Sequence, residues 1–434
     1  MLDALYLAQI DSQADAAVQV PLQEIHQPGL IHTKVSGKYE IVAELPKEAD
    51  NFDNIFTYAD AYGKIRLAYL NDVHKASASA LKEEKHASAL GGIMGIKTAA
   101  YEGFSFNIAA YISQSIDFLN PKKENLNPDF VNLNQDSFAY LGEANFNYEN
   151  EIFQAKIGRF QVETPYANSD DIRMAPNSFE GAFATFDYAE GFSSQVMYLT
   201  RWAGYDSQDA ESQDVFKNLT QESKGMAIAS LSYEYARNSE LSFWYSQIDA
   251  LSQIAYTELV GIHFIDGDAF HIDYGVQYSS LHELQNSNVA GDVLGLMSIL
   301  HYNGIFVGAA FNKAFVKEGK FITDGFGGGP YYTSLDEATI AAMSESSVGQ
   351  NIEAFRFGGG YELKQIGSGV LDGFMLELAY GKLQSQEKSV IEKDIILSYE
   401  MGERWYLEGI YTHFNAGYED QMFDRTLLRA NYAF

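Results

Sequence analysis

Charged side chains gather in one short polar stretch, residues 161–178, between two segments with alternating apolar residues. Its charged residues are Glu163, Asp170, Asp171 and Arg173, with Asn168 and Asn177 as polar partners. If acidic and basic groups face each other across a narrow passage, they orient dipolar solutes, whereas a ring of one sign selects ion charge. The structural alternative is that Asp170 and Asp171 cap the turn before Ile172, while Arg173 pins the stretch through a bidentate pair.

Basic residues also recur on the polar face of alternating segments. They are Lys64, Arg66, Lys156, Arg356, Arg425 and Arg429. Arg425 and Arg429 are four residues apart, so a single strand would present both on one face. Acids at equivalent positions are Glu143, Glu362, Glu377, Glu400 and Glu408. Side chains that are simply solvated on an inner wall are the alternative for each of these groups.

Other chemistry is poorly supported. The chain has no cysteine, which excludes thiol catalysis and cysteine-ligated metal sites, and its nine histidines are scattered without ligand spacing. HExxH, GxSxG and P-loop motifs are absent, and no Ser/His/Asp set can be assembled, so we expect neither an enzyme nor a cofactor. A net charge of -30 argues against nucleic-acid binding. Acids in one long loop could bind calcium or simply repel one another in solvent: Asp206, Asp209, Glu211 and Asp214.

Alternation with a period of two is the dominant pattern of the chain. In one segment Phe270, Ile272, Tyr274, Val276 and Tyr278 are interleaved with polar residues and glycine. About eighteen such segments follow, near 61–70, 88–101, 103–113, 137–148, 151–160, 179–188, 192–202, 224–235, 241–249, 254–264, 269–280, 293–302, 304–315, 354–364, 374–382, 393–401, 404–414 and 423–434. No apolar run is long enough for a membrane-spanning helix. We therefore predict an all-β fold, a transmembrane antiparallel β-barrel.

Two further observations agree with this prediction. Tight links such as 148–150, 189–191 and 302–304 alternate with long polar stretches such as 71–87, 114–136, 203–223, 281–292 and 316–353. This rhythm is typical of short periplasmic turns and long extracellular loops, although it weakens around 249–253 and 364–373. All eight prolines fall outside the predicted strands, as expected where every strand must donate hydrogen bonds on both sides.

The two ends of the chain differ. Residues 1–55 lack clean alternation and include three prolines, which predicts an extension on the periplasmic side or within the lumen, followed by a barrel over 56–434. The first residues have no basic segment or apolar core, so they are not expected to form a signal peptide. The last strand ends in Tyr432-Ala433-Phe434 and resembles the C-terminal signal of outer-membrane barrels.

A more specific resemblance covers the middle of the chain. The run KIGRFQVETPYANSDDIRMAPNSFEGAF, from Lys156 to Phe183, resembles the OprD-like outer-membrane porins, and in particular their epsilonproteobacterial branch of major outer-membrane proteins. The runs 63–69, 88–111 and GFGGGPYYTSLDE at 325–337 are also similar to that family. The resemblance implies eighteen strands, a third extracellular loop (here 161–178) folded inward as the constriction, and a basic inner wall that guides carboxylates.

These observations lead to one functional expectation and its alternatives. We expect a bacterial outer-membrane porin for passive diffusion of small hydrophilic solutes and ions, weakly cation-preferring because acids outnumber Arg173 on the third loop. A channel restricted to carboxylate-bearing solutes and a structural or adhesin barrel are the alternatives. The expected partners are the solutes, the lipid bilayer and lipopolysaccharide, without nucleic acid; a homotrimer is expected by family analogy, with a monomer as the alternative.

Overall fold

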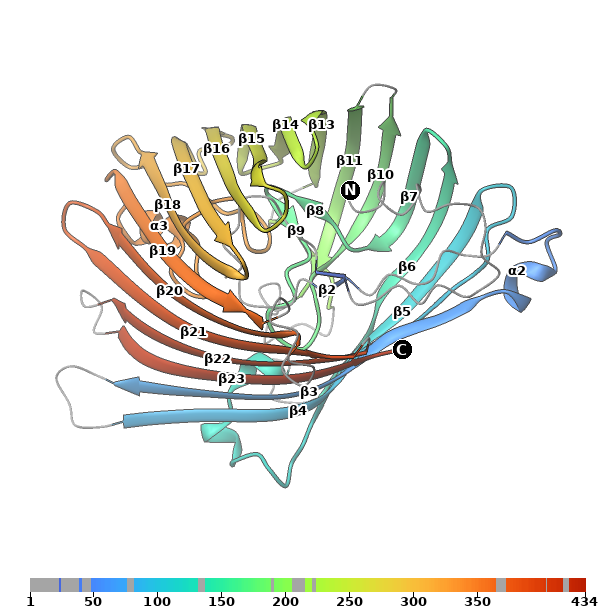
Figure 1. The fold of residues 1–434 in the computed structure, drawn as a ribbon, viewed down its shortest axis with the longest axis horizontal. Coiled ribbons are helices and arrows are strands. Elements are labelled where there is room, and N and C mark those ends of the chain that lie inside the picture. Colours follow the sequence, from blue (N-terminus) through green and yellow to red (C-terminus); the bar gives the residue numbers. More distant parts are fainter. Residues whose placement is uncertain are drawn as a thin grey trace.

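Eighteen antiparallel strands close into a single barrel in the computed structural model (Figure 1). The structure describes residues 48–75, 82–131, 137–188, 191–204, 215–220, 224–363, 372–402, 404–416 and 421–434, together with two short strands near the N-terminus. The barrel strands are β3 (Asp60–Lys75), β4 (Lys82–Lys97), β5 (Phe104–Ser115), β6 (Phe138–Asn150), β7 (Phe153–Phe160), β10 (Ser178–Asp187), β11 (Phe192–Ala203), β13 (Met226–Ala236), β14 (Ser239–Ile248), β15 (Ser252–Asp266), β16 (Phe270–Glu283), β17 (Gly291–Tyr302), β18 (Ile305–Phe315), β19 (Ile352–Glu362), β20 (Phe374–Gln384), β21 (Ser389–Met401), β22 (Trp405–Ala416) and β23 (Gln421–Ala433). Each strand pairs with its neighbours in sequence, and β23 closes the ring on β3, with Leu427 opposite Leu70.

Smaller elements accompany the eighteen strands, and one of them, β12, pairs with the end of β11. They are β1 (Gln23–Glu24), β2 (Tyr39–Glu40), α2 (Asn54–Thr57), two 3₁₀ turns (Lys123–Asn125 and Pro128–Phe130), β8 (Glu163–Thr164), β9 (Ala167–Asn168), β12 (Lys217–Asn218) and α3 (Ile340–Ser346). In the described part of the chain, no helix has the length and apolar character required to cross a membrane.

The alternating side chains separate an apolar outside from a polar inside. On β23, Leu428 is 48% exposed, whereas its neighbour Arg429 is 3% exposed. Phe355 and Phe357 on β19 point outward, and Arg356 between them is fully buried. Because the pleat reverses direction at each residue, the same alternation that predicted the strands also places the basic residues on the inner wall.

The sequence predicted all eighteen strands, with two errors in their extent. The predicted strand 88–101 is β4 (Lys82–Lys97), so residues 98–101 belong to a turn, and the predicted loop 71–87 is mostly strand. Likewise, β16 and β17 extend into the predicted loop 281–292. Polar residues such as Glu83 and Glu84 lie at the outer ends of these strands, where both faces are exposed. Hydrophobic alternation therefore stops before the hydrogen-bonded ladder does.

The long-loop side also contains tight connections. Residues 249–251 join β14 to β15 through a turn in which Ala250 has a positive φ of 60°. Residues 385–388 form a comparably short link between β20 and β21. The prediction of long loops thus holds for several connections on that side but not for all of them.

Two long loops fold back inside the ring and pack against each other. The third loop, 161–177, pairs with the 316–351 loop through a bridge between Ala167 and Phe326. Gly325 and Gly327 in the 316–351 loop have positive φ angles of 79° and 101°. A Cβ at either position would lie within 2.3 Å of an atom of the third loop. These glycines permit the close approach that fills this part of the lumen.

Both loops also contact the inner wall. Tyr166 of the third loop lies 2.7 Å, hydroxyl to hydroxyl, from Ser279 on β16. The backbone amide of Thr333 donates to Asn312 on β18 at 3.0 Å. Figure 1 shows β8 and β9 within the ring of strands.

Residues 48–57 contact the first turn on the short-turn side. Glu48 forms a bridge with Ala100, and the amide of Ala99 donates to the carbonyl of Ile55 at 3.0 Å. Most of residues 1–47 lie outside the described residues.

Candidate functional site

The third loop is fixed to the inner wall by Asp171. The guanidinium of Arg66, on β3, donates Nη1 to Oδ1 at 2.6 Å and Nη2 to Oδ2 at 2.8 Å. Lys64, two residues earlier on the same face, also pairs with Asp171. All three side chains are buried, so the pair is shielded from salt and water.

The surroundings of Asp171 set its charge state. Burial alone would raise the pKa of this carboxyl, but the nearby Arg66 and Lys64 outweigh burial and lower it to about 2. Asp171 is therefore a carboxylate at any physiological pH. From the sequence, Asp171 could have capped the turn before Ile172. In the structure its side chain instead pairs with Arg66 and Lys64 on the inner wall.

Arg173 joins three loops. Its Nε donates to Asp129 of the 116–137 loop at 3.0 Å. Its Nη atoms lie 3.7 Å from Asp336 and 3.5 Å from Glu337, both in the 316–351 loop. A planar guanidinium can hold several carboxylates at fixed angles, so Arg173 ties these loops into one unit.

Arg425 joins the wall to the same unit. From β23 it holds Asp72 on β3 through Nε at 2.7 Å and Nη2 at 3.0 Å. Its Nη1 donates to Asp336 at 3.3 Å and also to Glu337. Arg173 and Arg425 therefore share the same pair of loop acids.

The side chain of Arg429 binds the backbone of the third loop. Its Nε and Nη2 donate to Glu408 on β22 at 3.0 and 2.8 Å. Its Nη1 donates to the carbonyl of Asp171 at 2.8 Å. The inward register expected for Arg425 and Arg429 is thus present, but both guanidinium groups are already bound by protein acceptors.

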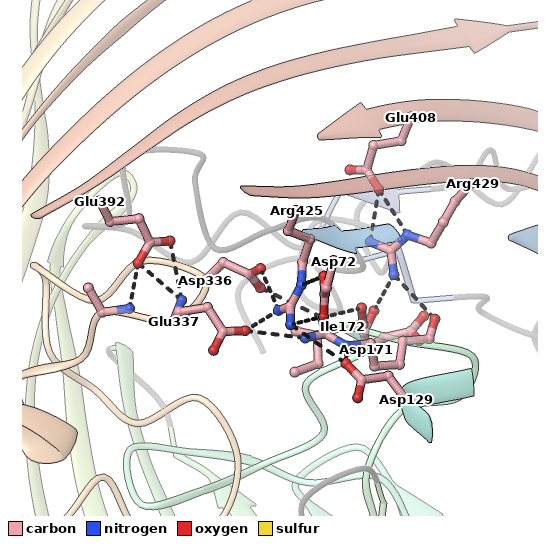
Figure 2. Close-up of polar contacts among 12 residues, drawn as sticks. Asp72, Asp129, Asp171, Ile172, Asp336, Glu337, Glu392, Glu408, Arg425 and Arg429 are labelled. Carbon is pink, nitrogen blue, oxygen red and sulfur yellow. Dashed lines mark hydrogen bonds and ion pairs between the residues drawn. The ribbon is translucent and has the colours of Figure 1, made fainter. Parts of the chain in front are cut away.

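These pairs form one continuous group, which we call the lumenal charge cluster. Figure 2 shows the part of it around Arg425 and Arg429. Its members are Lys64, Arg66, Asp72, Asp129, Asp171, Arg173, Asp336, Glu337, Glu408, Arg425 and Arg429. Beside it, Glu392 on β21 accepts the backbone amides of Glu337 at 3.2 Å and Ala338 at 2.5 Å. Burial raises the pKa of Glu337, partly against the pull of Arg425.

The remaining predicted residues are dispersed. Lys156 lies 5.3 Å from the ring centre of Phe183, and Arg356 donates to the carbonyl of Ser334 at 2.9 Å. On the third loop, Glu163 is exposed, Asp170 is half-buried, and Asn177 is buried with its amide 3.3 Å from the carbonyl of Asn168. The structure therefore separates Glu163 and Lys156 from the charge cluster.

Several members of the charge cluster were not predicted as site residues from the sequence. Asp72, Asp129, Asp336 and Glu337 belong to segments expected to be loops, and nothing in their spacing shows that they converge. The run 325–337 was noted as a family-like loop motif, which is the one signal that could have drawn attention to Asp336 and Glu337. The acids expected as a calcium site, Asp206, Asp209, Glu211 and Asp214, lie outside the described residues.

Part of the chain is similar to a known protein family. Residues 122–293, which include the third loop, match the family model described as outer membrane porin, OprD family. In this region the chain is similar to the OprD family of outer membrane porins. A search of curated proteins found no match.

Solved structures of porins have the same fold. OccK9 (OpdG) of Pseudomonas aeruginosa aligns with a TM-score of 0.73 at 13% identity, over 88% of this chain and 99% of that one. A BenF-like porin from Pseudomonas fluorescens Pf-5 gives 0.72 at 13% identity, with coverages of 88% and 99%. Pseudomonas aeruginosa OpdK, solved with vanillate, gives 0.71 at 13% identity with the same coverages.

The partial family match and the shared porin fold together indicate an outer-membrane channel rather than an enzyme. Its barrel is embedded in the membrane and admits small solutes. The charge cluster lies where the third loop meets the inner wall, which makes it the candidate site for control of what passes.

Proposed function

We propose that this porin allows passive diffusion of small hydrophilic solutes and ions with a weak preference for cations. The observation that carries the proposal is the pairing of the basic groups in the charge cluster. Lys64, Arg66, Arg173, Arg425 and Arg429 all contact carboxylates of the protein. Their positive charge is therefore largely neutralised before any solute arrives.

The charges on this inner surface also favour cations. Within the charge cluster, six carboxyl groups stand against five basic groups. Charges in a confined, poorly screened space influence permeation more than those on external loops, which salt screens within ~8 Å. The sign of this balance supports the proposed preference.

A channel for carboxylate-bearing solutes is the second candidate. Inward-facing Arg66, Arg425 and Arg429 lie on the adjacent strands β3 and β23, and OpdK, a porin of the same fold, was solved with vanillate. For this function, an entering carboxylate would have to compete with Asp171, Glu337 or Glu408 for the guanidinium groups. The tight pairing disfavours that exchange, because each displaced acid would remain buried without its partner.

Planar-bilayer recording separates these functions. The proposal expects ohmic steps that small aromatic carboxylates, such as vanillate, do not block. Small steps blocked by such carboxylates would favour the second candidate. Silence from protein that migrates as a folded barrel would favour the structural or adhesin role and contradict both channels.

Further expectations rest on family analogy and on residues 48–57. We propose a homotrimer within a bilayer containing lipopolysaccharide, and membership in the epsilonproteobacterial branch. The contact of Glu48 with Ala100 on the short-turn side supports a periplasmic position for the end of the 1–55 extension. A monomeric mass in mild detergent would contradict the trimer.

A further inference from the structure

Two histidines and an aspartate, none of which belongs to the charge cluster, meet on β16 and β17. The imidazole Nε2 of His301 lies 3.2 Å from Oδ2 of Asp273, and Nε2 of His271 lies 3.9 Å from Oδ1. One ligand atom from each of the three residues can be chosen so that all lie within 4.8 Å of one another. These are the residue types that bind divalent transition metals in proteins.

The strand register places all three residues on the inner wall. His271 is directly opposite His301 in the β16–β17 ladder, and Asp273 follows His271 by two residues, so the three share one face. Asp273 is 7% exposed and Gln277, farther along the same face, is 1% exposed. The group lies near the short turn at 303–304 that joins β17 to β18.

The orientation of His271 is fixed by its other ring nitrogen. Its Nδ1 lies 2.9 Å from the backbone carbonyl of Asp268, which can only accept a hydrogen bond. Nδ1 therefore carries the proton in the neutral ring, and the lone pair of Nε2 is directed toward Asp273. A backbone carbonyl behind a ligating histidine is a common arrangement in metal sites because it sets both tautomer and ring angle.

Aromatic contacts hold the two rings in place. The imidazoles of His271 and His301 are stacked, with centres 4.4 Å apart and planes within 11°. Phe306 stacks on His301 at 6.0 Å, and Phe264 lies 5.9 Å from His271. A metal ion binds in the plane of an imidazole ring, so the His301 ring must turn out of this stack for both Nε2 atoms to bind the same ion, while the Asp268 carbonyl holds His271.

Independent evidence comes from polar atoms that lack hydrogen bonds. Oδ1 of Asp273 and Nε2 of His301 are both buried without a hydrogen-bond partner. Leaving such buried atoms without hydrogen bonds costs free energy. A metal ion between these atoms would satisfy both.

We propose that His271, Asp273 and His301 bind one divalent transition-metal ion through the two Nε2 atoms and the Asp273 carboxylate. Bonds of ~2.0–2.1 Å to a tetrahedral ion place its ligands about 3.3 Å apart, close to the 3.2 Å between His301 and Asp273. Two imidazoles favour zinc, cobalt or nickel over calcium and magnesium, which prefer oxygen ligands. The three side chains leave the remaining coordination positions to water or to a passing solute.

Zinc binding to the purified full chain tests the site. The protein is prepared without a histidine tag, treated with chelator, dialysed against Zn²⁺, and its bound metal is measured by elemental analysis. We expect one Zn²⁺ per chain, with affinity reduced at least about tenfold in His271→Ala and in Asp273→Asn. His282→Ala removes an exposed histidine at the other end of β16 and should leave binding unchanged.

Folding and specificity are checked in the same preparations. Heat-modifiable gel migration confirms that each variant is a barrel, and Co²⁺ added to the unsubstituted protein should give visible absorption typical of a low-coordinate histidine site. An excess of Ca²⁺ should not displace Zn²⁺. Absence of stoichiometric Zn²⁺, or equal binding by folded His271→Ala protein, would overturn the proposal and leave the group as a structural contact. Neither result bears on solute preference, because the site does not depend on the proposed function.

Discussion

Asp171 on the third loop and Arg66 on the first barrel strand form a bidentate ion pair, with N–O distances of 2.6 and 2.8 Å and both side chains buried. The chain separates them by 105 residues, so the pair fixes the loop to a distant part of the wall. Because removal of one partner leaves the other charge buried and unpaired, this contact should affect both permeation and stability.

Asp171→Asn should shift the reversal potential toward anions. The substitution keeps the shape of the side chain but leaves the charges of Lys64 and Arg66 uncompensated beside the passage. Reversal potentials in a salt gradient measure the shift, and Asp170→Asn combined with Asp171→Asn should move it farther. Glu163→Gln removes one charge from the exposed part of the same loop and should change selectivity less. Unchanged conduction in the double variant would show that this loop does not form the constriction.

Arg173→Ala should raise single-channel conductance. Without the guanidinium, Asp129, Asp336 and Glu337 repel one another, and the third loop loses its contacts with two other loops. Arg159→Ala is the control, because Arg159 pairs with Glu180 on the adjacent strand at 3.2 Å. An increase in Arg159→Ala as large as in Arg173→Ala would refute a specific role for the loop contacts.

Arg429→Met should reduce the free energy of unfolding by about 3–5 kcal/mol, because it leaves Glu408 buried and unpaired. Adding Glu408→Met should restore part of that loss, which a double-mutant cycle in urea measures. The exposed pair Lys313–Glu353 has a similar N–O distance of 2.7 Å and should contribute at most about 1 kcal/mol. Additive losses from Arg429→Met and Glu408→Met would argue against a coupled pair.

The contribution of Asp171 to stability should disappear in acid. Its pKa is about 2 in the folded protein against an ordinary 3.8, so the ionised form stabilises the fold above pH 4 and this effect is lost as pH falls toward 2. Wild type should exceed Asp171→Asn by about 2 kcal/mol near neutral pH, and the difference should shrink toward zero near pH 2. Unfolding in urea across this range provides the measurement. A difference that stays constant with pH would contradict the paired carboxylate.

The strands could be predicted from sequence because one physical rule governs their whole membrane-facing length. Each residue such as Leu428 faces lipid and each neighbour such as Arg429 faces the lumen, so hydropathy alone reveals both element and direction. The rule fails beyond the hydrocarbon region, which explains why the first residues of β4 were assigned to a loop.

The charge cluster could be predicted only in part. The inward register of Arg66, Arg425 and Arg429 follows from alternation, but their partners do not. Asp336 and Glu337 reach the wall only because the 316–351 loop folds back beside the third loop, which is a long-range event without a local pattern. Similarly, His271 and His301 were judged too scattered to bind metal, since their approach depends on the register of the β16–β17 hairpin.

The reversal potential of the wild-type porin tests the central claim most directly. With a potassium chloride gradient across a planar bilayer, we predict open channels whose reversal potential is small and has the sign of the potassium equilibrium potential. That result would mean that carboxylates of the protein dominate the passage after neutralising the arginines of the charge cluster. A reversal potential with the sign of the chloride equilibrium potential would contradict the account, because it would show that the basic inner wall remains available to anions.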